Sequence, residues 1–338
     1  MNGIQIFIPF MMNLYIFFPL GFILGILTGF LGIGGGFFIT PALNILGFQM
    51  VYAIGTSFCS IAGNTFVGAI RHYGLGNVDF KLGTILGSLC IIGVDLGKRF
   101  LFYLEKLSLA GTYVRVAYIF ILLLISILML KEYSQYRNSN HKKTKIELGA
   151  QEERESPLSK QIYQIKIPPN ISLPHSGIDA ISIWVILIFG ILIGFLSGFM
   201  GIGGGFIGLP ILIYGMGVPT IIAIGTSLVN VFITSFYGTI LYAIEGKVEW
   251  ISVLILLAGS IIGVQVGAYA TKYVTPMKIR VLFALFMLLV AISILLKQIN
   301  MVTLSSYLLL GSAFLLSFAI LFPLIKKFVV NGLNKENS

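Results

Sequence analysis

Two glycine-rich stretches are the residues best suited to chemistry in this chain. They read GFLGIGGGFFITP at 29–41 and GFMGIGGGFIGLP at 198–210, each inside an apolar run. Consecutive glycines permit backbone dihedrals that other residues resist and let a ligand approach the main chain closely. A helix that restarts after such a break presents free N–H groups and the positive end of its dipole, which together favour an anion. The candidate substrate-binding residues of these stretches are Gly34, Gly35, Gly36 and Pro41 in the first and Gly203, Gly204, Gly205 and Pro210 in the second.

Close helix packing is the alternative explanation of such glycines, because small residues let two helices approach each other. We favour packing for Gly93, Gly97, Gly263 and Gly267, which have plain i, i+4 spacing. The stretch GGGFIG of the second copy also fits the dinucleotide pattern G-x-G-x-x-G. That fingerprint needs a preceding strand in a βαβ unit, and the first copy has Ile39 where the last glycine should be. We therefore reject a dinucleotide site.

A stripe of hydroxyl and amide side chains follows each glycine stretch. Its residues recur at i, i+4 and i+8, so they fall on one face of a helix. Neutral donors can coordinate an oxyanion without a buried fixed charge, which would cost ~2.5–3.5 kcal/mol at the bilayer centre. Hydrogen bonds between helices are the alternative role of these side chains. The stripes consist of Thr56, Ser57, Ser60 and Asn64 in the first half and Thr226, Ser227, Asn230 and Thr234 in the second.

Charged residues near predicted helix ends are candidates for gating or ion coupling. Arg71 is either a topology anchor at a membrane boundary or an anion gate. Asp79 and Glu249 share a repeat position and could bind a coupling cation or proton, or lie solvated in short loops. Asp95 is followed at i+3 and i+4 by basic residues, a spacing that favours a local ion pair.

The residue types that catalysis requires are scarce. An enzyme would need titratable groups that converge on one site. The chain has three histidines, His72, His141 and His175, two of them in a polar segment. Its cysteines, Cys59 and Cys90, lie inside apolar runs without the spacing of metal ligands. We therefore expect no enzymatic activity, no metal site and no cofactor.

The apolar character of the whole chain predicts an all-α polytopic membrane protein. Of its 338 residues, 57% are hydrophobic and 10% are charged. Runs of roughly 20 apolar residues can cross a hydrocarbon core of about 30 Å as helices. The first 30 residues hold no Lys or Arg, so the basic region of a signal peptide is missing and we expect this segment in the mature chain. We predict about nine full spans, at 13–31, 50–70, 79–101, 113–130, 180–200, 218–244, 249–271, 277–297 and 303–325, with half-helices at 36–47 and 205–215.

The two glycine stretches belong to a tandem duplication. A shift of 169 residues superposes the two copies of GIGGGF and the two prolines that follow them. A shift of 170 superposes the two copies of AIGTS, and GNVD on GKVE. Glycine-interrupted apolar segments at matching positions of two halves point to the binding site of a secondary transporter. Tyr242 replaces His72 at the same shift, so a pathway would be asymmetric there.

The duplication divides the chain into two membrane repeats joined by a polar linker. The linker holds eight Lys and Arg residues, so the positive-inside tendency places it in the cytoplasm, and its composition predicts mostly disorder. With the linker inside, the remaining basic residues favour inverted over parallel repeats only slightly. The four segments are the first repeat at 1–130, the linker at 131–177, the second repeat at 178–300, and an extra C-terminal helix and tail at 301–338.

These motifs resemble the sulfite exporter TauE/SafE family, also called the sulfonate uptake permease family. The resemblance rests on the duplicated GIGGGF blocks with their proline, each followed by AIGTS, and it covers both halves. It implies an integral membrane carrier of a small sulfur-containing anion such as sulfite or an organosulfonate. The long central linker departs from the compact pattern of the family.

The expected function is therefore a secondary transporter, a permease or exporter of the cell membrane that works by alternating access. The sequence has no nucleotide-binding motif. Transport would therefore be coupled to a proton or sodium gradient, or would proceed as facilitated flux. The net charge of +10 comes from basic residues at the ends of apolar runs and in the linker, so we expect lipid and no nucleic acid as a partner. An anion channel and a non-transporting membrane scaffold are the alternatives. Substrate identity, direction of transport and oligomeric state do not follow from the sequence.

Overall fold

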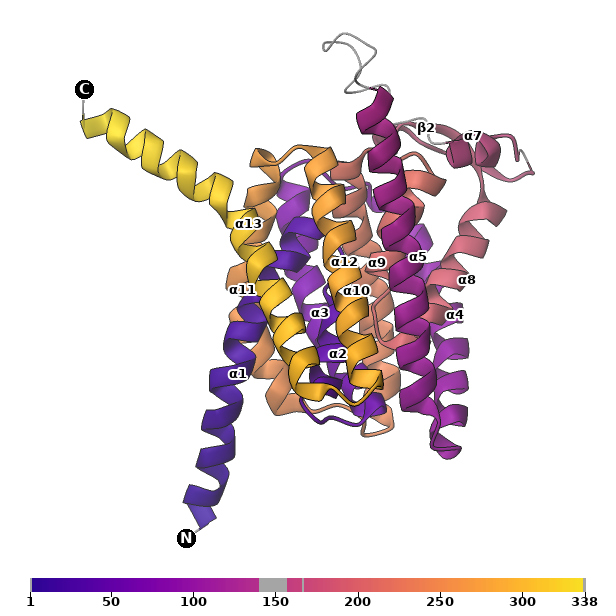
Figure 1. The fold of residues 1–338 in the computed structure, drawn as a ribbon. Coiled ribbons are helices and arrows are strands. Elements are labelled where there is room, and N and C mark those ends of the chain that lie inside the picture. Colours follow the sequence, from indigo (N-terminus) through magenta and orange to yellow (C-terminus); the bar gives the residue numbers. More distant parts are fainter. Residues whose placement is uncertain (1, 140–156, 166, 337–338) are drawn as a thin grey trace.

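The protein is an all-α polytopic membrane protein whose long helices form one bundle (Figure 1). The computed structural model describes residues 2–139, 157–165 and 167–336. Eight helices of this described part are long and apolar enough to cross a membrane, and Phe17–Leu31 is a further, shorter apolar helix. The all-helical class is confirmed, while the expected number of nine full spans stays a prediction.

The first repeat runs from the lower end of the bundle in Figure 1 to its upper end, where the linker begins. Its second helix is short, as expected for a half-helix, and ends close to the predicted boundary. The helices are α1 (Asn2–Leu31), α2 (Gly36–Ile45), α3 (Met50–Gly74), α4 (Phe80–Lys106) and α5 (Ala110–Ser139).

The second repeat has the same order of elements, and one more helix follows it. Its half-helix changes from α to π geometry at Ile211, one residue after Pro210, so the two half-helices differ in detail. The elements are α8 (Ile183–Met200), α9 (Gly205–Pro210), η3 (Ile211–Gly215), α10 (Thr220–Ile244), α11 (Trp250–Ala270), η4 (Thr271–Tyr273), α12 (Pro276–Gln298) and α13 (Val302–Glu336).

The two repeats are inverted relative to each other. Helices α3 and α10 correspond in the duplication, and their residues meet in reverse order: Gly55 lies against Tyr242, whereas Gly68 lies against Leu228. The corresponding helices therefore run antiparallel. Figure 1 shows the same relation for α1, which rises from the lower end, and α8, which descends from the upper end. The slight preference for inversion in the distribution of basic residues thus agrees with the structure.

Each repeat donates its first helix to the other repeat, and glycines make this exchange possible. Helix α1 packs on α11, and α8 packs on α4. A Cβ atom at Gly97 would lie 2.2 Å from the carbonyl oxygen of Phe195, and one at Gly263 would lie 2.1 Å from that of Phe22. No side chain fits at such distances, so the backbones are in direct contact. The packing role predicted for Gly93, Gly97, Gly263 and Gly267 is confirmed.

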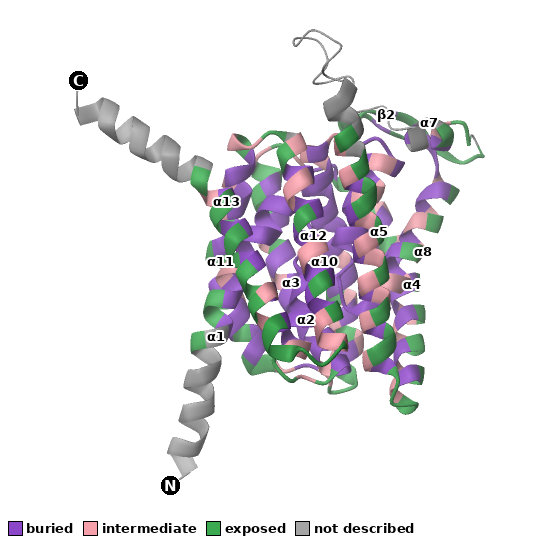
Figure 2. Cartoon of the chain, viewed as in Figure 1, coloured by how far each residue is buried: buried purple, intermediate pink, exposed green. Residues whose placement is uncertain are grey.

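The bundle buries apolar and polar residues in its interior and exposes further large apolar side chains on its outer faces. Figure 2 shows a buried interior in which α2, α3 and α10 lie, and exposed positions along the outward faces of α5, α12 and α13. Exposed large hydrophobic side chains include Phe120 on α5, Leu254 on α11 and Phe314 on α13. This pattern suits a chain whose outer surface meets lipid acyl chains instead of water.

The expectation of a mostly disordered linker at 131–177 is wrong for its described residues, because residues 131–139 continue α5 and the second half is also folded. Helix α7 (Pro157–Tyr163) is followed by an antiparallel hairpin of β1 (Asn170–Leu173) and β2 (Ile178–Ser182), with the short 3-10 turn η2 (Pro174–Ser176) between the strands. The hairpin reaches the membrane bundle, where the Ser176 hydroxyl donates to the Asp79 carboxylate at 2.6 Å. Composition alone missed this, because the order comes from contacts with the bundle. The linker residues 140–156 lie outside the described part of the chain.

We predict that Gly97→Ala destabilises the protein, because its methyl group would overlap the Phe195 carbonyl in the α4–α8 contact. Overpacking of this kind costs about 1–3 kcal/mol of the free energy of unfolding. Gly311→Ala is the matched control, since nothing lies within 4 Å of a Cβ there. Thermal unfolding of both purified variants in detergent checks this. Equal melting temperatures would contradict direct backbone contact between α4 and α8.

Candidate functional site

The two helix breaks meet in the interior of the bundle, and we call residues 32–36 and 201–205 together the glycine crossing. A Cβ atom at Gly36 would lie 2.5 Å from the Ile202 carbonyl oxygen, and one at Gly205 would lie 2.3 Å from that of Ile33. The contact is thus reciprocal between the repeats. Both half-helices restart there without a side-chain cap, at Gly35 with φ 80° and at Gly204 with φ 85°. The predicted interruption of both helices is confirmed.

Helices α3 and α10 cover the glycine crossing. Ile61 of α3 and Val231 of α10 each contact both breaks, through Gly34 and Gly203. Ser57 lies four residues before Ile61, and Ser227 lies four residues before Val231, so each serine shares the face that its helix turns toward the crossing. The structure therefore brings the predicted glycines and the first part of the predicted polar stripes together.

Two stripe residues hold the repeats together by hydrogen bonds. The backbone N–H of Asp79 donates to the Thr226 hydroxyl at 2.9 Å, and that of Glu249 donates to the Thr56 hydroxyl at 3.0 Å. The two bonds occupy equivalent positions in the two repeats. Asp79 precedes the first residue of α4 and Glu249 precedes that of α11, and each is bonded to a threonine of the other repeat. Thr56 and Thr226 therefore make hydrogen bonds between helices, which is the alternative to substrate binding that the sequence left open.

Further stripe residues bond within their own helix or to a neighbouring one. The hydroxyls of Ser60 and Thr234 donate to the backbone carbonyls of Thr56 and Asn230, at 3.1 and 2.8 Å. Asn64 accepts from Ser260 of α11. The side-chain oxygen Oδ1 of Asn230 accepts from the Cys90 thiol at 3.4 Å, so Cys90 is a buried packing residue with a weak polar contact.

Several buried polar atoms near the crossing have no hydrogen-bond partner among the described residues. They come from both repeats, and two pairs occupy equivalent positions, Thr28 with Ser197 and Ser57 with Ser227. A buried hydroxyl without a partner costs ~1–3 kcal/mol, so such atoms are rare in a native structure and call for an explanation. The atoms are Thr28 Oγ1, Ser57 Oγ, Ser197 Oγ, Ser227 Oγ, Asn230 Nδ2 and Ser235 Oγ.

Three of these atoms lie directly beside motif glycines. A Cβ at Gly35 would be 3.1 Å from Thr28 Oγ1, one at Gly203 would be 2.6 Å from Ser235 Oγ, and one at Gly208 would be 3.4 Å from Asn230 Nδ2. Sequence reasoning missed Thr28, Ser197 and Ser235. The first two were accessible to it, because they align with each other at the shift of 169 that superposes the glycine motifs.

His72 and Tyr242 perform the same task in the two repeats. His72 Nε2 lies 2.8 Å from the Gly29 carbonyl oxygen, and the Tyr242 hydroxyl donates to the Gly198 carbonyl at 2.8 Å. Both carbonyls belong to the helix before the break. The replacement of His72 by Tyr242 therefore preserves this hydrogen bond, although the sequence suggested an asymmetry there. His72 Nδ1 has no partner among the described residues.

The predicted charged residues lie at the ends of helices. Arg71 is exposed at the end of α3. Asp79 is buried at the start of α4, where its carboxylate accepts from the Leu82 N–H at 3.0 Å and from Ser176. Glu249 begins α11 and is half-buried. Asp95 pairs with Arg99 at 2.7 Å, which confirms the local ion pair. A gating or coupling role for Arg71, Asp79 and Glu249 stays a prediction.

The described residues contain no group of three or more His, Cys, Asp or Glu side chains that could hold a metal ion. The polar atoms at the glycine crossing are neutral hydroxyls and amides, together with backbone N–H groups at the starts of the half-helices. Such a set can donate hydrogen bonds to a small anion.

Comparison with known proteins gives a consistent family. Residues 17–294 match the family described as Sulfite exporter TauE/SafE. The chain is 27% identical to the probable membrane transporter protein YunE of Bacillus subtilis, over 82% of this chain and 96% of that protein. It is 25% identical to the probable membrane transporter protein MJ0441 of Methanocaldococcus jannaschii, over 85% of this chain and 99% of that protein. No solved structure matches.

We predict that the bonded and the unpartnered stripe residues respond oppositely to removal of their hydroxyls. Thr56→Val and Thr226→Val should each cost about 1–3 kcal/mol of the free energy of unfolding, because they leave a buried backbone N–H without an acceptor. Ser57→Ala and Ser227→Ala should leave the stability unchanged or raise it, because no bond is lost.

Thermal unfolding in detergent measures both effects, with Thr56→Ser as the control that keeps the hydroxyl. A loss of stability in the serine variants as large as in the threonine variants would show that Ser57 and Ser227 have structural partners.

Proposed function

The chain belongs to the sulfite exporter TauE/SafE family of membrane transporters, and on that basis we propose that it carries a small sulfur-containing anion, such as sulfite or an organosulfonate, across the cell membrane. The observation that supports this most directly is the set of unpartnered donors around the glycine crossing. An oxyanion has several acceptor oxygens and could satisfy hydroxyls and an amide from both repeats at once.

The backbone of the breaks adds to these donors. The first N–H groups of a helix have no partner within the helix, and Gly35 and Gly204 provide no side-chain cap. Two half-helix N-termini that meet in the interior of the bundle direct the positive ends of two dipoles toward the same region. Discontinuous helices at the interface of inverted repeats have this role in secondary transporters.

The closed packing of the crossing implies a conformational step. The carbonyls of Ile33 and Ile202 lie where a substrate would have to approach Gly205 and Gly36. We propose that one group of helices moves against the other by alternating access, which separates the breaks from one end of the bundle at a time. The hydrogen bonds from Glu249 to Thr56 and from Asp79 to Thr226 would then break and reform at different steps of the transport cycle.

We propose a proton or sodium ion as the coupling ion. Asp79 and Glu249 remain the candidates for it, because they are equivalent acidic residues that flank the bonds between the repeats. The two differ in surroundings, since Asp79 also accepts from the linker hairpin. Any coupling through this pair would therefore be unequal at the two ends of the bundle.

We predict that Ser57→Ala and Ser227→Ala reduce uptake of radiolabelled sulfite, thiosulfate or a small sulfonate into proteoliposomes by about tenfold each, because each removes one hydrogen bond to a charged ligand. Ser317→Ala is the matched control. Its hydroxyl is also buried without a partner, but it lies on α13, which follows the second repeat.

Saturable uptake that depends on a counter-ion gradient would favour a carrier over an anion channel. No flux of any of these anions by the unmodified protein would favour a non-transporting scaffold. Undiminished uptake by both serine variants would show that these two unpartnered hydroxyls do not bind the substrate.

A further inference from the structure

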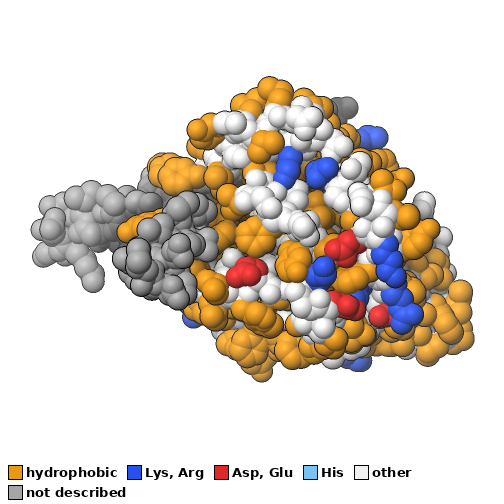
Figure 3. Space-filling view, turned by 90° about the horizontal axis from the view of Figure 1, so that it is seen from below, with side chains coloured by type: hydrophobic (Ala, Val, Ile, Leu, Met, Phe, Trp, Pro, Cys, Tyr) orange, Lys and Arg blue, Asp and Glu red, His pale blue; other side chains and the backbone are white. Residues whose placement is uncertain are grey.

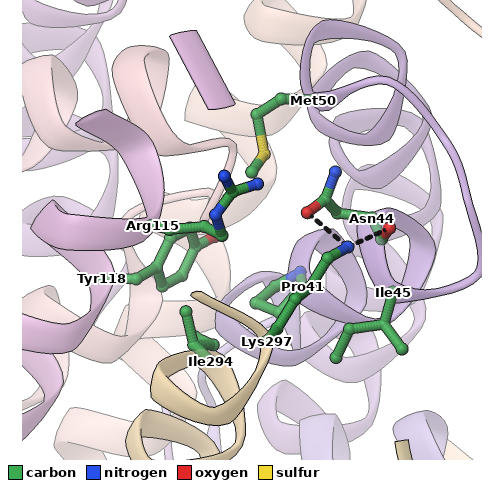
Figure 4. Close-up of a pocket in the computed structure, with 8 residues that line it drawn as sticks. All are labelled: Pro41, Asn44, Ile45, Met50, Arg115, Tyr118, Ile294 and Lys297. Carbon is green, nitrogen blue, oxygen red and sulfur yellow. Dashed lines mark hydrogen bonds between the residues drawn. The ribbon is translucent and has the colours of Figure 1, made fainter. Parts of the chain in front are cut away.

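A second polar feature lies at the lower end of the bundle, between α2, α5 and α12. It is a narrow pocket, and Figure 4 shows Arg115 of α5 and Lys297 of α12 beside Asn44 of α2 around it. Met50 of α3 also lines the pocket. The three main helices contribute Pro41, Asn44 and Ile45 from α2, Arg115 and Tyr118 from α5, and Ile294 and Lys297 from α12.

Arg115 and Lys297 line the same pocket, and no carboxylate is among its lining residues. The Arg115 Nε donates to the Gln298 side chain at 2.6 Å, and the Lys297 amine donates to the backbone and side-chain oxygens of Asn44. These partners are neutral. In the described part of the chain neither cation has an acidic partner within ion-pair distance.

Two other partly buried cations at the same end of the bundle are paired. Lys98 contacts Glu245 at 2.8 Å, and Lys247 contacts Glu105 at 3.3 Å. Figure 3 shows Lys, Arg and acidic side chains near one another on the lower face. Two half-buried cations without a counter-charge are costly in a partly desolvated position unless an anion joins them. The contrast with the paired lysines therefore points to a ligand at Arg115 and Lys297.

The geometry of the donors suits an oxyanion. The two terminal NH2 groups of Arg115 are left over after its Nε bond, and a guanidinium presents such groups as a fork that matches two oxygens of one anion. Lys297 retains a third N–H donor beyond its two bonds to Asn44. A single small oxyanion would balance both charges and accept from both side chains, which have to move apart to admit it because the pocket is narrow.

The pocket also leads toward the glycine crossing. Tyr118, one turn beyond Arg115, is fully buried, and its hydroxyl donates at 2.9 Å to the carbonyl of Met200, the residue at which α8 ends. The same hydroxyl lies 3.5 Å from the Gly36 carbonyl oxygen. Tyr118 thus separates the pocket from the crossing by the thickness of one side chain.

We propose that Arg115 and Lys297 form an anion-binding site at the lower entrance, where a small oxyanion is held before it reaches the glycine crossing past Tyr118. The location of this site on a transport route depends on the proposed function. The binding of an anion by these two cations does not depend on transport. In the other repeat, Arg280 of α12 contacts Tyr214 and Thr220, which correspond to Asn44 and Met50 of this pocket at the shift of 170.

Direct binding tests the site without any assay of flux. Sodium sulfite, at constant ionic strength set with sodium chloride, should raise the melting temperature of the purified full-length protein, since a ligand that binds the folded state stabilises it. The shift should disappear in the double variant Arg115→Gln/Lys297→Gln and persist in Lys278→Gln, which removes one exposed charge at the other end of α12. Absence of a shift in the unmodified protein, or an undiminished shift in the double variant, would overturn the site.

Two further measurements separate this proposal from a folding defect and from the proposed function. The variant Arg115→Lys/Lys297→Arg keeps both charges and should retain a shift with sulfite. In proteoliposomes the double glutamine variant should raise the sulfite concentration for half-maximal uptake by about tenfold at low ionic strength, while the maximal rate is kept. An unchanged half-saturation would reject the site as an entrance. A melting shift without any uptake would uphold the anion site and reject transport of that anion.

Discussion

The structure depends on one constraint: a backbone polar group inside a hydrocarbon environment must find a partner within the protein. A continuous helix meets this requirement by itself, whereas a broken one exposes N–H and C=O groups at the break. The two breaks of this chain are therefore placed against each other and under α3 and α10, in the interior of the bundle. Tyr118 and Thr40 donate to the carbonyls of Met200 and Gly201, and His72 and Tyr242 bond the carbonyls of Gly29 and Gly198. These backbone carbonyls have partners, whereas several side-chain hydroxyls beside the crossing have none among the described residues, and that contrast is informative.

The inverted duplication explains how a single arrangement supplies these partners twice. Because corresponding helices run antiparallel, each repeat places its first helix against the fourth helix of the other, and its hydroxyl stripe against the start of that fourth helix. The glycines on α1, α4, α8 and α11 are needed for the first of these contacts, and the threonines Thr56 and Thr226 make the second. Neither repeat could bury its own break alone. The exchange of helices thus ties the integrity of the candidate site to the association of the two halves.

Much of this was predictable from the sequence, and the parts that were not share a physical reason. The duplication, the helix breaks at Gly35 and Gly204 and the packing role of Gly97 follow from residue types and spacing, which are local properties. The sequence could not separate the bonded Thr56 from the unpartnered Ser57, because that difference depends on which backbone N–H of another helix lies opposite. The hairpin at residues 170–182 was missed for the same reason, since it is ordered by contacts with the bundle. Arg115 and Lys297 stand 182 positions apart in the chain and become a pair only when α5 and α12 pack together.

The linker hairpin has a consequence for the energetics of an otherwise symmetric molecule. An ideal inverted repeat has two end states related by rotation, and these would be equal in free energy. Here Ser176 holds Asp79, and Tyr163 of α7 donates to the Met216 carbonyl just beyond the second half-helix, both near the upper end of Figure 1. The equivalent residue Glu249 has no such hydrogen bond to the linker in the described part of the chain. In the proposed transport cycle the two end states would therefore differ in free energy, and the state that keeps these two hydrogen bonds would be favoured.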